Sequence, residues 1–245
     1  MSKDTKSLAG KVALVTGGSR GIGSSIAREL ALRGAAVAIT GTTQVSADRG
    51  RAAIDADGAR VLALAVDVRD QAQVSAAVAR VVSELGGLDI LVNNAGIGHF
   101  TPVAETSPED WRRVIDVNLN GVFYCCHAAI PHLKARGGGW IVNVSSLAGK
   151  NTFARGGVYC ASKWGLTALS EVLMEELRQD GIRVSYVMPG SVATEFNGRP
   201  PGPEDDWKLS PDDVALVVTD LLGHPGRSLP SRVEIRPSRP ARSKA

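Results

Sequence analysis

The feature that most restricts the fold of this chain is an alternation of short apolar runs with longer helix-like segments. The runs are continuously apolar rather than alternately apolar and polar, which is typical of strands buried on both faces of a parallel sheet. Right-handed crossovers would then give a doubly wound α/β domain, with a mostly parallel seven-stranded sheet and helices on both faces. The expected strands cover residues 11–16, 35–40, 61–66, 88–93, 140–145, 182–188 and 232–236.

Helix-like segments fill the intervals between those strands. Residues 107–110 read Ser-Pro-Glu-Asp, which places a capping serine, a proline at the first position and acids in the first turn of a helix. We expect that helix to run without a break to about residue 135, before the three glycines at 137–139. The expected helices cover residues 22–32, 44–56, 70–85, 109–135, 157–179 and 211–222.

Length and composition indicate a single domain. The 245 residues are 44% hydrophobic and 22% charged, and no Pro/Ser-rich linker divides them. A formal net charge of +3 is too small to favour a nucleic-acid or membrane partner. Because no signal peptide or transmembrane run is visible, we expect a cytoplasmic protein, with flexible tails at 1–8 and 237–245. Three cysteines have neither metal-ligand spacing nor the even count of a disulfide framework: Cys125, Cys126 and Cys160.

A glycine-rich loop follows the first expected strand and precedes the first expected helix. Residues Thr16 to Gly23 read TGGSRGIG. Glycines allow a tight turn and let backbone N–H groups approach a phosphate, which then meets the positive end of the helix. This context predicts a pyrophosphate site, although the spacing G-x-x-x-G-x-G differs from the best-known dinucleotide fingerprint.

The end of the second strand favours NADP(H) as the cofactor, with NAD(H) as a possible alternative. A site for NAD usually has an acid there, which accepts hydrogen bonds from the ribose hydroxyls. Here the residues are Gly41, Thr42 and Thr43, and the first acid is Asp48. The missing carboxylate, together with Arg20 in the glycine loop, favours a 2′-phosphate. Two more arginines are either additional phosphate contacts or parts of a solvated helix face: Arg49 and Arg51.

Ser146, Tyr159 and Lys163 form a candidate proton-transfer site. A spacing of four places Tyr159 and Lys163 on the same face of a helix, one turn apart. The ordinary pKa of tyrosine is about 10, and a neighbouring ammonium should lower the pKa of Tyr159 by favouring the phenolate. Ser146 could hold a carbonyl or alcohol oxygen while the tyrosine exchanges a proton with it. The alternative is a solvated lysine–tyrosine pair without a catalytic role.

These motifs occur in the order found in short-chain dehydrogenases/reductases, and the chain resembles that family from about residue 8 to about residue 236. The resemblance implies a single Rossmann-type domain and a hydride exchange between a nicotinamide cofactor and a carbonyl or secondary alcohol carbon. Besides the glycine loop and the Ser-Tyr-Lys set, it rests on Asp67, Asn93-Asn94-Ala95-Gly96, Asn118 and Pro189-Gly190…Thr194.

The resemblance also implies a role for each matching residue. Asp67 would accept from the adenine amino group, Asn93 would support the strand beside the adenosine, and Thr194 would bind the nicotinamide amide. Lys163 would bind the nicotinamide ribose, while Asn118 would open its helix enough to hold a water that relays protons to that lysine. The expected catalytic residues are therefore Asn118, Ser146, Tyr159 and Lys163, and the expected cofactor-binding residues are Gly17, Ser19, Arg20, Gly21, Ile22, Gly23, Thr42, Thr43, Asp67, Val68, Asn93, Ala95, Gly96, Tyr159, Lys163, Pro189, Gly190, Val192 and Thr194.

The sequence leaves the substrate and the assembly open. The first half resembles 3-oxoacyl-acyl-carrier-protein reductases, whereas the short loop after Pro189 and the ending LPSRVEIRPSRP resemble members that act on hydroxy acids, sugars or small ketones. A non-catalytic NADP-binding regulator would be expected to lack the serine, tyrosine or lysine, and all three are present. His99 and Phe100 are candidate substrate contacts, because they follow the Asn-Asn-Ala-Gly turn. Apolar residues on the helices at 109–135 and 157–179 favour a homo-oligomer, either a dimer or a homotetramer.

Overall fold

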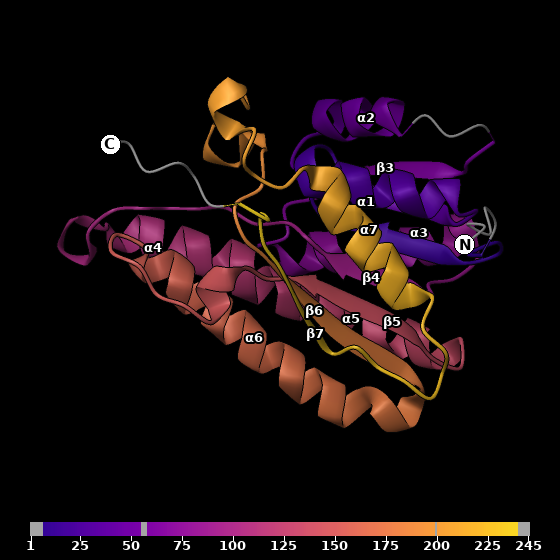
Figure 1. The fold of residues 1–245 in the computed structure, drawn as a ribbon. Helices are drawn as coiled ribbons and strands as arrows, with labels where there is room; N and C mark the ends of the chain where they lie inside the picture. Colours follow the sequence, from indigo (N-terminus) through magenta and orange to yellow (C-terminus); the bar gives the residue numbers. More distant parts are fainter. Residues whose placement is uncertain (1–6, 55–57, 199, 240–245) are drawn as a thin grey trace.

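A single parallel sheet forms the centre of the protein, which we describe from a computed structural model covering residues 7–54, 58–198 and 200–239 (Figure 1). Every pair of neighbouring strands is parallel, and the strand order is β3-β2-β1-β4-β5-β6-β7. The sheet therefore winds in two directions from the boundary between β1 and β4, as expected for a doubly wound fold. The strands are β1 (Val12–Val15), β2 (Ala36–Gly41), β3 (Val61–Ala65), β4 (Ile90–Asn93), β5 (Gly139–Val144), β6 (Ile182–Pro189) and β7 (Arg232–Ile235).

Helices cover both faces of this sheet. The side chains of β1 alternate between two apolar cores: Leu14 belongs to the core shared with α3, α5 and α6, and Val15 to the core shared with α1 and α7. Both cores thus meet at a fully buried strand, which explains why the strand sequences are continuously apolar. The helices are α1 (Gly21–Leu32), α2 (Gln44–Ala53), α3 (Gln71–Leu85), α4 (Pro108–Ile115), α5 (Gly121–Ala135), α6 (Gly157–Leu177) and α7 (Pro211–Leu222).

The helix expected over 109–135 is divided in the structure. α4 and α5 are separated by a π-helical segment, Asp116–Asn120, in which the turn is wider than in an α-helix. Asn118 lies at its centre and is fully buried, and its side chain bonds to groups outside the helix. The continuous helix expected from the apolar pattern was therefore wrong over these five residues, because the pattern does not register a change of helical pitch.

The described ends of the chain are held against the domain. Leu8, which we expected in a flexible tail, is buried in the core and its backbone N–H donates to Arg33 O at 2.9 Å. At the other end, Pro237 packs against Gly190, since a Cβ placed on that glycine would lie 3.1 Å from Pro237 Cδ. The remaining parts of the expected tails, 1–6 and 240–245, lie outside the described residues.

Candidate functional site

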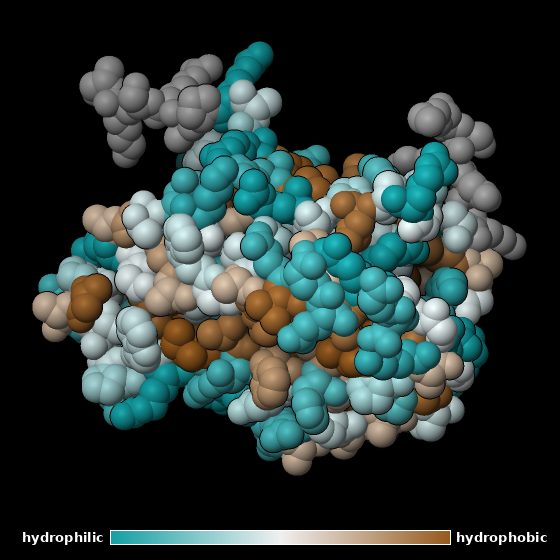
Figure 2. All heavy atoms as spheres, turned by 90° about the horizontal axis from the view of Figure 1, so that it is seen from below, coloured by the Kyte–Doolittle hydropathy of each residue, from teal (hydrophilic) through white to brown (hydrophobic). Residues whose placement is uncertain are grey.

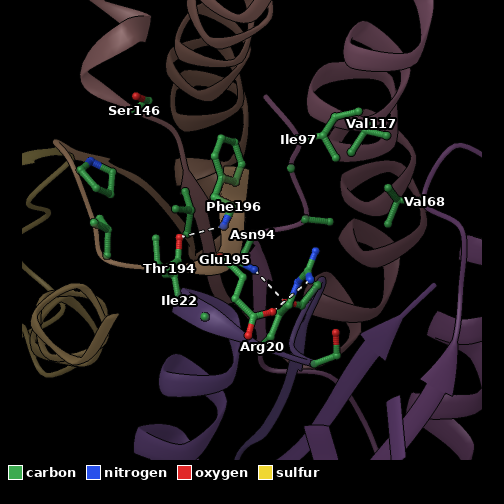
Figure 3. Close-up of a pocket in the computed structure, with 18 of the residues that line it drawn as sticks. Arg20, Ile22, Val68, Asn94, Ile97, Val117, Ser146, Thr194, Glu195 and Phe196 are labelled. Atoms are coloured by element: carbon green, nitrogen blue, oxygen red, sulfur yellow. Dashed lines mark hydrogen bonds and ion pairs between the residues drawn. The ribbon is translucent and has the colours of Figure 1, made fainter. Parts of the chain in front are cut away.

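A cleft of about 780 Å³ lies at the carboxyl edge of the sheet, where the loops after six strands converge (Figure 3). The connections after β1, β2, β3, β4, β5 and β6 all contribute residues to its lining. This is the edge at which ligands bind in open parallel sheets. Most residues expected to bind a cofactor line the cleft: Gly17, Ser19, Arg20, Gly21, Ile22, Thr42, Asp67, Val68, Ala95, Gly96, Tyr159, Lys163, Pro189, Gly190, Val192 and Thr194.

The glycine loop has the shape of a phosphate cradle. Gly17 and Gly21 have φ angles of +62° and +54°, a region that side chains other than glycine rarely adopt. A Cβ on Gly17 would also lie 2.9 Å from Ala95 Cα, so the two loops pack backbone to backbone. α1 begins at Gly21 with no side-chain cap and no acid in its first turn. Its first N–H groups thus have no partner within the helix and face the cleft with a positive dipole.

Gly23 and Thr43 do not line the cleft, contrary to their expected role. A Cβ on Gly23 would lie 2.4 Å from Asn94 Nδ2, so this glycine lets the helix pack closely against the loop behind it. Thr43 caps α2, since its hydroxyl accepts a hydrogen bond from Ser46 N at 3.1 Å. Ser46, rather than Thr43, lines the cleft. A threonine just before a helix is equally suited to a cap and to a ligand contact, and the sequence did not separate the two.

The arginines divide clearly between the cleft and the surface. Arg20 and Arg49 line the cleft together with Thr42, whereas Arg51 is exposed on α2 and is not part of the lining. Arg20 Nη1 also pairs with Glu195 Oε2 at 3.3 Å, so the loop after β1 is linked to the loop after β6 (Figure 3). Neither this ion pair nor Glu195 was expected from the sequence, since the two residues are 175 positions apart.

Asp67 follows β3 and is paired with Arg69. The Arg69 Nε donates to Asp67 Oδ2 at 3.0 Å, and this hydrogen bond holds the pKa of the Asp67 carboxyl below its usual value. Both residues line the cleft, as does Val68 between them. The carboxylate that would accept from an adenine amino group is thus ionised and held in place.

The two asparagines after β4 have different places. Asn93 is buried behind the cleft, and its Nδ2 donates to Asn143 Oδ1 at 2.9 Å, while no partner for its Oδ1 is found among the described residues. Asn94 lines the cleft and donates to the backbone oxygens of Thr16 and Gly17 at 3.0 and 3.1 Å. Asn93 therefore supports the strand from behind, whereas Asn94 fixes the glycine loop.

Tyr159 and Ser146 meet at the deep end of the cleft. Tyr159 lies in the first turn of α6, and Ser146 follows β5, where its Oγ accepts from Ala148 N at 3.1 Å. Removal of the phenol from water raises the pKa of Tyr159, and a hydrogen bond from Ser146 only partly opposes this effect. The pKa of Tyr159 is thus raised overall rather than lowered as expected, with desolvation as the largest cause.

Lys163 lies one turn after Tyr159 on the same helix and is 5% exposed. Its Nζ is 6.0 Å from the centroid of the Tyr159 ring and donates to Val144 O at 2.9 Å. Burial lowers the pKa of the Lys163 ammonium from 10.5 to about 8. The pair is therefore not a solvated one, and its cation is directed at the end of β5.

Asn118 stands behind these residues rather than in the cleft wall. Its Nδ2 donates to Ile97 O at 2.9 Å and to Ser162 Oγ at 3.0 Å, and its Oδ1 accepts from Ile97 N at 2.9 Å. The side-chain amide thus joins the π segment to α6 and to the loop after β4.

Two phenylalanines contact Tyr159, and a third contacts one of them. The ring centroid of Tyr159 is 5.3 Å from that of Phe100 and 5.9 Å from that of Phe196, and Phe153 is 5.9 Å from Phe100. Phe100 was expected near the substrate, but Phe153 and Phe196 were missed, because nothing in the pattern of either loop distinguishes them. His99 is turned away, with its Nδ1 4.0 Å from Asp110 Oδ1, and it is not part of the cleft lining.

The described ranges contain no group of three potential metal ligands, and the three cysteines are free and buried. They also contain no helix whose length and hydropathy would allow it to cross a lipid bilayer.

Comparisons with known proteins agree on one family. A family model described as short chain dehydrogenase matches residues 11–201. Trans-4-hydroxycyclohexanecarboxylate dehydrogenase of Sinomonas cyclohexanicum is 41% identical over 231 residues, which are 91% of this chain and 88% of that protein. Glycine betaine reductase of Emericella nidulans is 36% identical over 94% of this chain, but the match spans only 19% of that longer protein. A metagenomic short-chain oxidoreductase solved in complex with NADP has a TM-score of 0.84 and 39% identity, covering 95% of this chain and 99% of that one.

Proposed function

The chain belongs to the short-chain dehydrogenase family and is an oxidoreductase, and on that premise we propose that it uses NADP(H) to interconvert a carbonyl compound and a secondary alcohol. The observation that carries this proposal is the shared cleft, which has the glycine loop at one end and Ser146, Tyr159 and Lys163 at the other. Its direct test is the oxidation of NADPH in the presence of a panel of ketones. A protein that binds NADPH but reduces no member of the panel would contradict it.

The cleft fits a dinucleotide along its whole length. Asp67 and Val68 suit the adenine, the glycine loop suits the pyrophosphate, and Lys163 and Thr194 suit the nicotinamide riboside. The bare amides at the start of α1 and the positive φ angles of the loop support this assignment from the structure itself. When bound, the nicotinamide supplies or takes up the hydride.

The protein side chains donate and accept the proton of the reaction. In the reductive direction, the carbonyl carbon gains the hydride while its oxygen gains the Tyr159 proton, and Ser146 holds that oxygen with a hydrogen bond. The raised pKa of Tyr159 keeps the phenol protonated at neutral pH, which suits proton donation. Lys163, with its pKa lowered to about 8, can exchange a proton near neutral pH and so reload the tyrosine.

Replacing Arg20 by alanine should reduce the preference for NADPH over NADH. A charge-assisted hydrogen bond contributes about 1.5–3 kcal/mol, so the ratio of the two kcat/KM values should fall by about tenfold or more. Arg51→Ala is a matched control, since Arg51 is exposed and does not line the cleft, and it should leave the ratio unchanged. A wild-type protein that prefers NADH at equal concentration would refute the cofactor assignment.

Apolar side chains on α4, α5 and α6 support a homo-oligomer. Four large residues there are 42–51% exposed: Trp111, Phe123, Trp164 and Val172. Figure 2 views the side of the molecule on which α6 lies, and apolar side chains gather across the middle of that face. We infer that this face joins copies of the chain into dimers or tetramers.

Sedimentation velocity should give a dimer or tetramer for the wild type and smaller species for the Phe123→Glu/Trp164→Glu double variant. A monomeric wild type at micromolar concentration would refute this interface.

A further inference from the structure

The phenylalanines around Tyr159 come from three separate loops but form one apolar surface. Phe100 follows β4, Phe153 follows β5 and Phe196 follows β6. The planes of Phe100 and Phe196 are tilted by 67° and 64° to that of Tyr159, which is the edge-to-face arrangement that aromatic pairs favour. We call these three residues the phenylalanine collar. Phe100 and Phe196 line the cleft beside the Tyr159 ring, and Phe153 packs against Phe100.

Gly98 allows the collar to close. A Cβ on Gly98 would lie 2.7 Å from Phe100 Cε2 and 2.8 Å from Phe196 Cε1, closer than any side chain tolerates without displacing both rings. The φ angle of Gly98 is not in the left-handed region, so the backbone itself would accept alanine. The absence of a side chain at position 98 thus lets the two rings approach each other, and it is not required by a turn of the backbone.

The outer part of the collar is left bare. Phe153 and Phe196 are 49% and 41% exposed, although both belong to a cluster with Phe100 and Tyr159. Single exposed apolar residues are ordinary, but here the exposed rings belong to one cluster that includes Tyr159. A flat apolar ligand placed against these rings would cover that area and gain hydrophobic contact.

The cations of the cleft offer little to a negatively charged substrate. Four of them in the described chain have acidic partners: Arg20 with Glu195, Arg69 with Asp67, Arg113 with Asp110 and Lys208 with Asp205. Arg49 lies beside Thr42 and Ser46 on the loop and helix after β2, at the nucleotide end. Buried Lys163 is bonded to Val144 O. A carboxylate at the collar would therefore lie against apolar rings.

We propose that the phenylalanine collar selects an uncharged ketone or secondary alcohol whose reacting carbon lies in, or next to, an apolar ring. This inference rests on the proposed function and narrows its substrate class. Open-chain polyhydroxy ketones would lose hydrogen bonds to water against the rings, and ring carboxylates would be desolvated without a cationic partner.

Kinetic comparison of matched ketones with NADPH tests the proposal. 4-Methylcyclohexanone and 4-oxocyclohexanecarboxylate have the same ring and differ in charge, and erythrulose supplies an open-chain polyhydroxy ketone. We expect kcat/KM for 4-methylcyclohexanone to exceed both others by about tenfold or more, and Phe100→Ala to remove most of that difference. Leu32→Ala is the control, since Leu32 is an exposed apolar residue of α1. Equal or better turnover of the carboxylate or of erythrulose would overturn the proposal and leave the proposed function standing.

Gly98→Ala offers a second variant, which should fold normally because only two side-chain rings have to move. Its kcat/KM for 4-methylcyclohexanone should fall by about tenfold, while its affinity for NADPH stays that of the wild type. An unchanged kcat/KM would show that the closure of Phe100 and Phe196 does not matter for the substrate.

A binding measurement separates this inference from the proposed function. Benzamide has the shape of an aryl methyl ketone but is not reduced, so its affinity for the protein–NADPH complex can be measured by calorimetry without turnover. We expect benzamide to bind about tenfold or more tightly than acetamide, and Phe100→Ala to remove the difference. If no ketone is reduced but benzamide binds in this way, the proposed function fails and the collar's preference holds. Equal affinities for the two amides would overturn the collar's preference whatever the turnover.

Discussion

Tyr159→Phe should lower kcat for ketone reduction by about 10³-fold while leaving the affinity for NADPH almost unchanged. The variant removes only the hydroxyl that we propose as the proton donor, and general acid catalysis by a placed side chain typically contributes about 10²- to 10⁴-fold. The ring itself stays, so its contacts with Phe100 and Phe196 are kept. Initial rates of NADPH oxidation, with affinity measured by fluorescence titration, would give both quantities.

Tyr186→Phe is a matched control for this experiment. Tyr186 is buried in β6, and its hydroxyl donates to Glu171 Oε1 at 2.6 Å, away from the cleft. The same chemical change there should cost about 1.5–3 kcal/mol of unfolding free energy and leave kcat within about twofold of the wild type. Retained turnover in Tyr159→Phe would remove the tyrosine from the mechanism.

Lys163→Met should abolish turnover and, at the same time, make the folded protein more stable at neutral pH. A fall in the pKa of Lys163 from 10.5 to about 8 means that burying the protonated amine costs about 3 kcal/mol. Methionine has a similar length and no charge, so it avoids this cost and loses only the bond to Val144 O, about 1 kcal/mol. Urea denaturation at pH 7 should therefore show a net gain of about 2 kcal/mol.

The pH dependence provides the sharper check. Because the folded-state pKa of Lys163 is the lower one, the unfolded chain binds more protons between pH 8 and 10.5, and wild-type stability rises over this interval. The advantage of Lys163→Met should thus be full below pH 8 and shrink towards pH 10.5. The contradicting outcome is a Lys163→Met variant that is less stable than the wild type by the same amount at pH 7 and at pH 10. That result would show that the buried ammonium stabilises the fold.

Sequence reasoning identified the sheet, the glycine loop and the Ser-Tyr-Lys set because each depends on local pattern. Continuous apolar runs predict buried strands, and parallel strands necessarily bring their carboxyl ends to one edge. This topology alone placed Gly17, Ser146 and Tyr159 in one cleft. The family comparisons confirmed the fold and the oxidoreductase class.

Features that depend on which side chains meet in three dimensions were not predictable in this way. Thr43 is a residue type suited to ligand contacts, but its hydroxyl caps a helix. The pKa of Tyr159 is set mainly by desolvation, and the spacing of residues along the chain does not show how deeply a side chain is buried. The collar consists of residues up to 96 positions apart, whose rings meet only after the sheet has formed. The pairing of Arg20 with Glu195 is hidden for the same reason.

The parallel sheet has a consequence for redesign. Arg20 and Thr42, which we propose as the residues that select the coenzyme, lie in the loops after β1 and β2. Phe100, Phe153 and Phe196 lie in the loops after β4, β5 and β6. Each of these connections begins and ends on a strand or helix anchored in the core. Grafting the second set of loops from a homologue should therefore transfer substrate preference and leave coenzyme choice with the recipient, so that the two specificities can be recombined independently.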